Sequence, residues 1–417
     1  MMRTTSAIAI AALSGALAAP PASAQSGFSF NSDDDDSAAQ TQLRVDAGSV
    51  LRAGDGGAAW LADIDAELEY ENFTAAGRRY GFVLGGRIER DTGRRAWGGR
   101  AGDCPPGQPG CAAISDGGTV RALVSPVSGF RSAGAPDGED TRGVIDAAYL
   151  YYDTGWGELR AGYGPGANEI DIVGGPAAFR LTRADGGRVN TGLIAGARTT
   201  NLTSGTDAKL VFRSVALGQE ISVGTLQASV SYTPSVRQCG VDACAREYGP
   251  AGALSPVFDD VVALSLRYAI RRGGHEWTIG AGTSRGSDAT GRPAFGTIET
   301  HDAGIAWSWG AWSAGARVLT SNAGLAGDQG YQAWSASGGY EAGPWLFTLE
   351  YAGFSDDAIH VDGDSWQIGG SRLIGERWLA GAGLQSSRRS EPVATPAGRS
   401  QADRDTATVF LELGWQF

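Results

Sequence analysis

The sequence predicts an all-β protein, a transmembrane antiparallel β-barrel of about 16 strands closed around a lumen. Three observations support this fold class. Apolar and polar residues alternate with a period of two, almost without a break, from Thr41 to the end of the chain. The connections between these stretches are alternately short and long. No run of about 18 apolar residues is present, which excludes membrane-spanning helices from the expected fold.

The N-terminal segment is typical of exported proteins. Residues 1–24 combine Arg3, an apolar stretch and Ala22-Ser23-Ala24 before Gln25, and we expect them to be a cleaved signal peptide. Because they carry one positive charge and no negative one, cleavage changes the formal charge from -12 to -13. Residues 25–40 are polar and include four consecutive aspartates at 33–36. A solvated leader is favoured there over a divalent-ion or cell-wall contact.

The predicted strands continue from residue 41 to residue 417. In the clearest one, WLADIDAELEY, the carboxylates of Asp63, Asp65, Glu67 and Glu69 share one face and apolar residues share the other. A slip of one residue would turn all four carboxylates to the apolar side, so the register is fixed. The expected strands are 42–52, 59–73, 80–91, 143–153, 158–168, 208–217, 221–235, 258–271, 276–285, 297–309, 312–321, 331–341, 345–355, 364–374, 378–388 and 405–417.

Connection lengths and aromatic positions favour a barrel that spans a membrane. The expected long connections are 94–142, 169–207, 236–257, 286–296, 322–330, 356–363 and 389–404, with short turns between them. Trp and Tyr flank the short turns, as at Trp309 and Trp312, where an aromatic girdle would meet the headgroups. A single sheet of this size splits into two or closes around a lumen that side chains cannot fill, so the polar face should line water.

The four cysteines lie in two of the long connections. In an exported chain we expect two local disulfides, Cys104–Cys111 and Cys239–Cys244, although four cysteines allow three pairings. Zinc is disfavoured because the spacings are wrong and no histidine is near. No cofactor or metal is expected, since His275, His301 and His360 lack ligand spacing. The acidic charge and the lack of a basic stripe argue against nucleic-acid binding.

The chain resembles the general-diffusion porins of Gram-negative outer membranes, especially the glycine-rich alphaproteobacterial type. Residues 147–163 with Gly166-Ala167 and the terminal Phe417 carry the resemblance, and the layout extends it over 41–417. It implies periplasmic short turns, extracellular long loops, contact with lipid and lipopolysaccharide, and passive diffusion of small hydrophilic solutes. It also implies a C-terminal signal for the barrel assembly machinery, formed here by Leu411, Leu413, Trp415 and Phe417.

The resemblance also suggests where solutes are selected. In the family the third long loop folds into the pore, and its acids face basic residues on the wall. Here that loop is 169–207, and the candidate constriction residues are the acids Glu169 and Asp171 with the basic residues Arg44, Arg87, Arg160, Lys209 and Arg213. The second long loop, 94–142, would latch onto a neighbouring subunit of a homotrimer.

One feature departs from the family pattern. Where the family often has basic wall residues, this chain offers the acidic patch Asp63, Asp65, Glu67 and Glu69. Together with the charge of -13 it suggests a mild preference for cations. The alternatives are a substrate-specific channel for sugars or carboxylates and, ranked lower, an outer-membrane barrel enzyme. A sugar channel should have aromatics along the inward loop, where only Phe179 occurs.

Overall fold

The structure of the protein is a computed structural model. It describes residues 28–29, 39–55, 57–91, 100–102, 114–116, 119–132, 140–188, 197–218, 224–236, 254, 256–327, 329–396 and 398–416. The expected signal peptide, most of the expected leader, all four cysteines and Phe417 lie outside the described residues.

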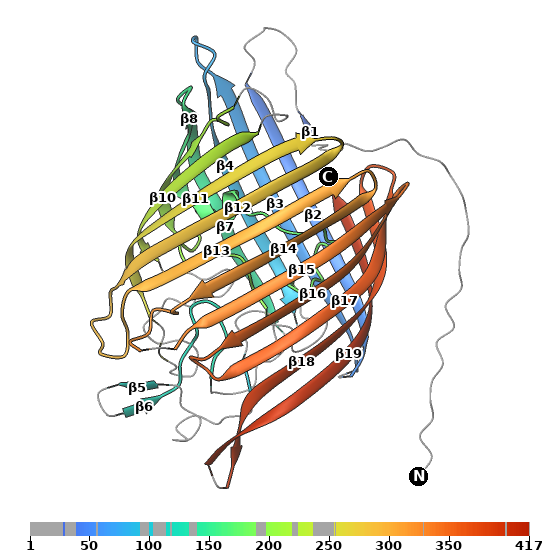
Figure 1. The fold of residues 1–417 in the computed structure, drawn as a ribbon. Helices are drawn as coiled ribbons and strands as arrows, with labels where there is room; N and C mark the ends of the chain where they lie inside the picture. Colours follow the sequence, from blue (N-terminus) through green and yellow to red (C-terminus); the bar gives the residue numbers. More distant parts are fainter. Residues whose placement is uncertain are drawn as a thin grey trace.

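The chain forms one large antiparallel sheet that closes on itself (Figure 1). Seventeen strands share the sheet; the short β1 (Phe28–Ser29) pairs with β2, and the other 16 form the ring. In ring order these are β2 (Gln40–Gly54), β3 (Gly57–Phe73), β4 (Arg79–Asp91), β7 (Asp140–Asp153), β8 (Gly157–Tyr163), β9 (Ala208–Ser214), β10 (Thr225–Val236), β11 (Phe258–Arg272), β12 (His275–Asp288), β13 (Ile298–Trp309), β14 (Trp312–Ser321), β15 (Tyr331–Ala342), β16 (Trp345–Asp356), β17 (Val361–Ile374), β18 (Trp378–Thr395) and β19 (Gly398–Gln416). The prediction of an antiparallel barrel of about 16 strands is confirmed.

The ring is closed by its first and last strands. β19 pairs antiparallel with β2, for example Leu413 opposite Ser49, and every other strand of the ring pairs with its neighbours in the chain. Closure leaves no exposed sheet edge within the ring, which is the only way a sheet can satisfy its backbone hydrogen bonds in lipid.

The two faces of the strands differ as the alternation predicts. On the outer face large apolar side chains are exposed, such as Leu349 at 56%, Ile368 at 46% and Leu411 at 49%. Their inward neighbours Glu350 and Glu412 are buried, at 4% and 1%. The apolar face therefore contacts hydrocarbon, and the polar face points into the barrel.

Aromatic side chains gather on the outer face beside the short turns. Trp309 and Trp312 flank the turn between β13 and β14 and are 50% and 54% exposed. Trp312 packs against Tyr340 of the next strand, with ring centroids 4.6 Å apart. This arrangement agrees with the predicted girdle, because Trp and Tyr favour the headgroup level of a membrane.

Several predicted boundaries are wrong. The connection expected at 356–363 is short, since only residues 357–360 separate β16 from β17. β8 ends at Tyr163 rather than near 168, because Pro165 has no N–H with which to continue the ladder. Residues Ala167–Ile170 instead form α1, and no described helix is long or apolar enough to cross a membrane. The range 389–404 is not a long loop, since β18 and β19 extend as a paired hairpin to Thr395 and Gly398.

The connection between β4 and β7, expected as the second long loop at 94–142, divides into two parts. Its hairpin of β5 (Ile114–Asp116) and β6 (Thr119–Arg121) stands clear of the barrel at the rim of the long connections (Figure 1). Residues 122–132 instead fold inward and are largely buried, with Leu123 at 0% and Phe130 at 1% exposure. This inward part contacts its own barrel, so it is not available as the expected latch onto a neighbouring subunit.

Candidate functional site

The connection between β8 and β9, expected as the third long loop at 169–207, runs inside the barrel. We call residues 164–207, of which 164–188 and 197–207 are described, the pore loop. The backbone nitrogen of Ala167 donates to Ser231 Oγ on β10 at 3.1 Å, and that of Ala178 donates to Thr348 Oγ1 on β16 at 3.2 Å. Its hydrogen bonds to inward-facing residues on distant strands confirm the prediction that one loop folds into the lumen.

Glycines on the inner wall make room for the pore loop. A Cβ at Gly304 would lie 2.1 Å from the carbonyl oxygen of Val173, and one at Gly280 would lie 2.7 Å from Val173 Cγ2. A Cβ at Gly369 would lie 2.6 Å from the ring of Phe179. Real Cβ atoms do not approach other atoms so closely, so at these three positions the loop can lie against the wall only because the wall residue has no side chain.

Asp171 fixes the start of the pore loop to the wall. Its carboxylate is 3% exposed and accepts hydrogen bonds from Ser229 Oγ and, at 2.8 Å, from Ser265 Oγ. Arg213 of β9 forms an ion pair with it at 3.0 Å. The acid Asp171 and the basic residue Arg213 thus meet as expected. They meet in a buried contact, where wall hydroxyls supply the remaining hydrogen bonds, and not in open water.

Glu412 of the last strand holds the middle of the pore loop. Its carboxylate accepts hydrogen bonds from the backbone nitrogens of Arg180 at 2.7 Å, Leu181 at 3.1 Å and Thr182 at 3.1 Å. The hydroxyl of Thr182 donates to it at 2.9 Å. One carboxylate therefore accepts hydrogen bonds from three consecutive backbone N–H groups and one hydroxyl of the pore loop. Such charge-assisted hydrogen bonds are stronger than neutral ones.

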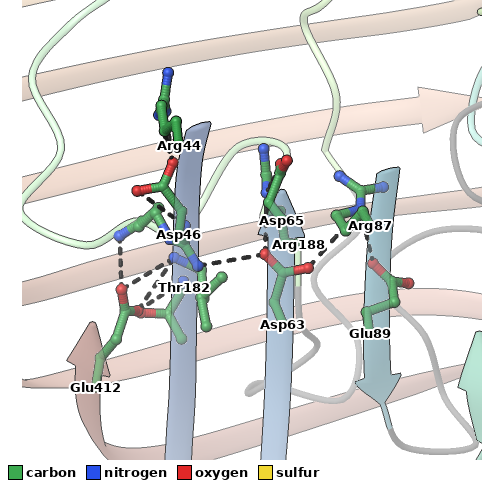
Figure 2. A network of polar contacts seen from close by, with 11 residues as sticks. Arg44, Asp46, Asp63, Asp65, Arg87, Glu89, Thr182, Arg188 and Glu412 are labelled. Carbon is green, nitrogen blue, oxygen red and sulfur yellow. Dashed lines mark hydrogen bonds and ion pairs between the residues drawn. The ribbon is translucent and has the colours of Figure 1, made fainter. Parts of the chain in front are cut away.

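Asp63 of β3 is the centre of a cluster of arginines (Figure 2). It is fully buried and pairs with Arg188 at 3.0 Å, Arg180 at 3.5 Å and Arg87 at 3.8 Å. Arg188 also pairs with Asp65 at 3.2 Å. Two of these cations, Arg180 and Arg188, come from the loop, and their anionic partners belong to the wall, so these pairs reverse the polarity that the resemblance implies.

A cavity of about 470 Å³ lies between the pore loop and the strands β2, β3, β4 and β7. Both sides of the cavity carry charge. Six carboxylates line it, from Asp46, Asp65, Glu67, Glu89, Asp146 and Glu169. Four guanidinium groups do so as well, from Arg44, Arg87, Arg188 and Arg198. A charged, open space of this kind admits water and small polar solutes and disfavours apolar ones.

The structure brings together some of the predicted constriction residues. The ones that line the cavity are Arg44, Arg87, Asp65, Glu67 and Glu169. The ones that do not are Asp63, Glu69, Arg160, Asp171, Lys209 and Arg213. Arg160 pairs with Glu158 at 2.5 Å and lies over the ring of Tyr149.

Lys209 does not act as the expected wall charge. Its side chain is buried, and its ammonium group donates to the carbonyl oxygens of Gly164, at 2.6 Å, and Gly205. These carbonyls belong to the two ends of the pore loop. The single lysine of the chain therefore ties the loop ends together, because a buried ammonium needs acceptors on all sides.

Asp146 is a cavity residue that alternation could not reveal. The register between β4 and β7 shifts between Gly85 and Gly86, so that Gly85 pairs with Ala147 and Gly86 pairs with Ile145. Asp146 is the extra residue of this bulge and points inward together with Ala147. A Cβ on Gly85 would lie 3.0 Å from Asp146 Oδ1, so the glycine leaves space for the carboxylate.

Glu169 faces the cavity from α1. Its carboxylate accepts a hydrogen bond from the backbone nitrogen of Gly166 at 3.1 Å. Burial raises the pKa of the Glu169 carboxyl above its usual range, although Lys209, the Gly166 N–H and Arg198 favour its charged form. Glu169 is thus an acid of the pore loop that its burial makes easier to protonate.

A closed barrel with a lipid-facing exterior and a charged, water-accessible lumen defines a transmembrane diffusion channel. A sequence model of the Gram-negative porin family matches residues 7–392 of the chain. The chain belongs to this family, and it is an outer-membrane protein that forms a diffusion channel.

Solved structures share the fold at low sequence identity. The anion-selective porin from Comamonas acidovorans is 11% identical, with 91% of this chain and 100% of that one covered and a TM-score of 0.53. OmpF of Salmonella typhi is 11% identical, with 91% of this chain and 98% of that one covered and a TM-score of 0.51. OprB of Pseudomonas putida is 9% identical, with 91% and 94% covered and a TM-score of 0.52. No curated protein matches the sequence.

Proposed function

We propose that the protein passes ions and small hydrophilic solutes passively, with a mild preference for cations. The observation that carries the proposal is the charge of the cavity between the pore loop and β2, β3, β4 and β7, where six carboxylates face four guanidinium groups. Because the cavity is narrow and partly walled by protein, a fixed excess of negative charge there concentrates cations and repels anions.

Two of these carboxylates contribute most to the preference. Among the described residues, neither Glu67 nor Asp146 has an ion-pair partner within 4.0 Å, whereas Asp65 is paired with Arg188. Glu67 lies directly opposite Gly85 in the sheet, and the Asp146 carboxylate lies over the same glycine. Two neighbouring carboxylates without a bound counter-charge attract mobile cations more strongly than paired ones do.

The test is the reversal potential of the purified protein in a planar bilayer under a potassium chloride gradient. The proposal expects a potential of the sign that marks potassium as the more permeant ion. Replacing Glu67→Gln and Asp146→Asn together should move it towards zero or to the chloride side. A matched pair of exposed acids, Asp362→Asn with Asp403→Asn, should leave it unchanged. A wild-type potential that favours chloride would refute cation preference.

General diffusion is preferred over a sugar-specific channel. The single aromatic of the pore loop, Phe179, is 3% exposed and packs edge-on against Phe410, with centroids 4.8 Å apart. An aromatic track for sugars needs exposed rings, so this packing supports a structural role. We also propose that the chain is not an enzyme, which its family and fold support. Hydrolytic activity in a preparation without ohmic conductance would overturn both statements.

Export, cross-links and assembly remain part of the proposal. Cleavage after Ala24 predicts a mature chain that starts at Gln25, which intact mass would reveal. The disulfides Cys104–Cys111 and Cys239–Cys244 would appear in peptide maps under non-reducing conditions. We expect a homotrimer in which the hairpin β5–β6, which stands clear of the barrel, meets a neighbour. Light scattering in detergent with and without this hairpin tests that contact.

A further inference from the structure

We propose that residues 122–132, here called the mouth segment, form a second size filter inside the channel entrance. The segment comes from the connection between β4 and β7, separate in sequence from the pore loop. The proposal rests on the channel function stated above, and it concerns the size limit for solutes rather than their charge. Its failure would therefore leave the proposed cation preference untouched.

The mouth segment has its own compact structure. The backbone nitrogen of Ser125 donates to the carbonyl oxygen of Phe130 at 2.9 Å, and that of Gly129 donates to Ser125 at 2.8 Å. The two ends of the segment are joined by hydrogen bonds between Ser132 and Leu123, at 2.9 and 3.0 Å. Internal hydrogen bonds of this kind fix a tight turn, so the segment presents one defined surface to the wall.

That surface is anchored to the inner wall at β16 and β18. Ser128 Oγ donates a hydrogen bond to the buried carboxylate of Asp356, the last residue of β16. The ring of Phe130 packs against Phe354 with centroids 6.4 Å apart. The guanidinium of Arg389 on β18 lies 5.1 Å from the centroid of the Phe130 ring. Phe130 is thus held between an aromatic and a cation, both of which point inward.

Leu254 of the connection between β10 and β11 and Ala101 of the segment's own connection also secure the segment. The backbone nitrogen of Val124 donates to the carbonyl oxygen of Leu254 at 2.8 Å, and Leu254 donates back to Ala122 at 2.8 Å. Ala101 donates to the carbonyl oxygen of Arg131 at 3.0 Å. Leu123 and Leu254 are both fully buried. These contacts make the mouth segment part of the packed structure rather than a free loop.

The mouth segment and the pore loop fill the same half of the lumen. Leu123, Val127 and Phe130 of the segment belong to one apolar cluster that also contains Ala184 and Ala197 of the pore loop. The wall residues of this cluster lie on β14 to β17. The open cavity lies on the other side, against β2, β3, β4 and β7. Solutes that enter the barrel are therefore confined to a narrowed passage along those four strands.

The test measures the size limit with uncharged polyethylene glycols of graded length, added to single channels of the purified full-length protein. In Phe130→Ala, loss of the ring should loosen the segment, raise conductance and let longer polymers enter. Ser128→Ala, which removes one anchor without creating a cavity, should shift the limit in the same direction by less. The matched control Phe347→Ala, on the lipid face, should leave the limit unchanged.

Folding of each variant is checked by heat-dependent gel mobility, and the reversal potential should stay at the wild-type value because Glu67 and Asp146 are intact. An unchanged polymer limit in folded Phe130→Ala and folded Ser128→Ala would overturn the proposal. Should Phe130→Ala not fold, the outcome for Ser128→Ala decides it alone. A limit that shifts equally in Phe347→Ala would also overturn it, because the effect would then not depend on the mouth segment.

Discussion

Arg188 Nη1 lies 3.0 Å from Asp63 Oδ2, which joins a guanidinium of the pore loop to a fully buried carboxylate on β3. Arg180 and Arg87 approach the same carboxylate. This cluster is therefore a wall anion surrounded by three cations, two of which belong to the pore loop. Removal of this anion affects both the position of the loop and the charge of the pore.

Asp63→Ala should release the pore loop and raise anion permeability. Removing one partner of a buried ion pair costs about 3–5 kcal/mol, because the remaining charges stay buried without compensation. The arginines should move towards water, so that single-channel current becomes noisier and the reversal potential shifts towards chloride. The control Asp405→Ala removes a 70% exposed partner of Arg388 and should change neither quantity.

Gly304→Ala should displace the pore loop although it adds only a methyl group. The new Cβ would lie 2.1 Å from the carbonyl oxygen of Val173, a backbone atom that cannot rotate away. We expect an altered conductance and a loss of stability of about 1–3 kcal/mol from overpacking. Gly296→Ala is the matched control, since nothing lies within 4 Å of its Cβ. Equal conductance in both variants would contradict the seating of the loop on glycine.

Phe179→Ala should detach the part of the pore loop that is held by apolar contacts. Truncation of a buried phenylalanine costs about 3–5 kcal/mol. The barrel ring stays closed, and the expected result is a folded protein with larger and more variable conductance, measured in planar bilayers. Proteolysis of the folded variant should cut within 164–207 sooner than in wild type. Wild-type conductance and cleavage would show that Glu412 and Asp63 hold the loop without the ring.

Leu349→Arg tests the assignment of the outer face. Leu349 is 56% exposed on β16, and an arginine at the middle of a lipid-facing strand costs about 2–4 kcal/mol. The free energy of unfolding in lipid vesicles, followed by tryptophan fluorescence in urea, should fall by that amount. Thr320→Arg, on an exposed strand position near the rim, should cost much less. Equal losses would mean that the two positions meet the same surroundings.

Cation preference should weaken with falling pH earlier than ordinary glutamates would allow. Because the pKa of the Glu169 carboxyl is raised, it takes up a proton above the usual glutamate range. Above this raised pKa the folded protein holds the buried charge of Glu169, so the free energy of unfolding falls as the pH rises through it. Protonation of Glu169 at lower pH removes that loss. Reversal potentials measured from pH 8 downwards, at about one pH unit per step, should show this component. Glu169→Gln should lack it.

Much of the fold could be predicted because each strand has one face in lipid and one in the lumen. That contrast between the two faces predicted the register and the number of strands. It gave no signal where the two faces of a strand have similar surroundings. Beyond Arg388 the outer face of β18 carries no large apolar side chain, only Ser390, Pro392 and Ala394, so the extended hairpin looked like a loop. The strands remain paired there, but the hydropathy of their residues no longer alternates in a way that indicates a strand.

The site was less accessible to prediction than the fold. Arg44, Arg87, Asp65 and Glu67 have lumen parity, and they line the cavity. Asp146 breaks parity through a bulge, which depends on strand pairing that no local pattern shows. Arg188 and Arg198 belong to a loop without period, and their positions follow from contacts with strands far away in the chain. Spacing cannot encode such contacts.

The pairing of β2 with β19 also constrains how the protein is made. A chain that lacks its final strand would leave two open edges, each a template for adding a strand from another molecule. We therefore expect a product without β19 to aggregate rather than to form a smaller pore, so closure makes the working channel an all-or-none product of the complete ring.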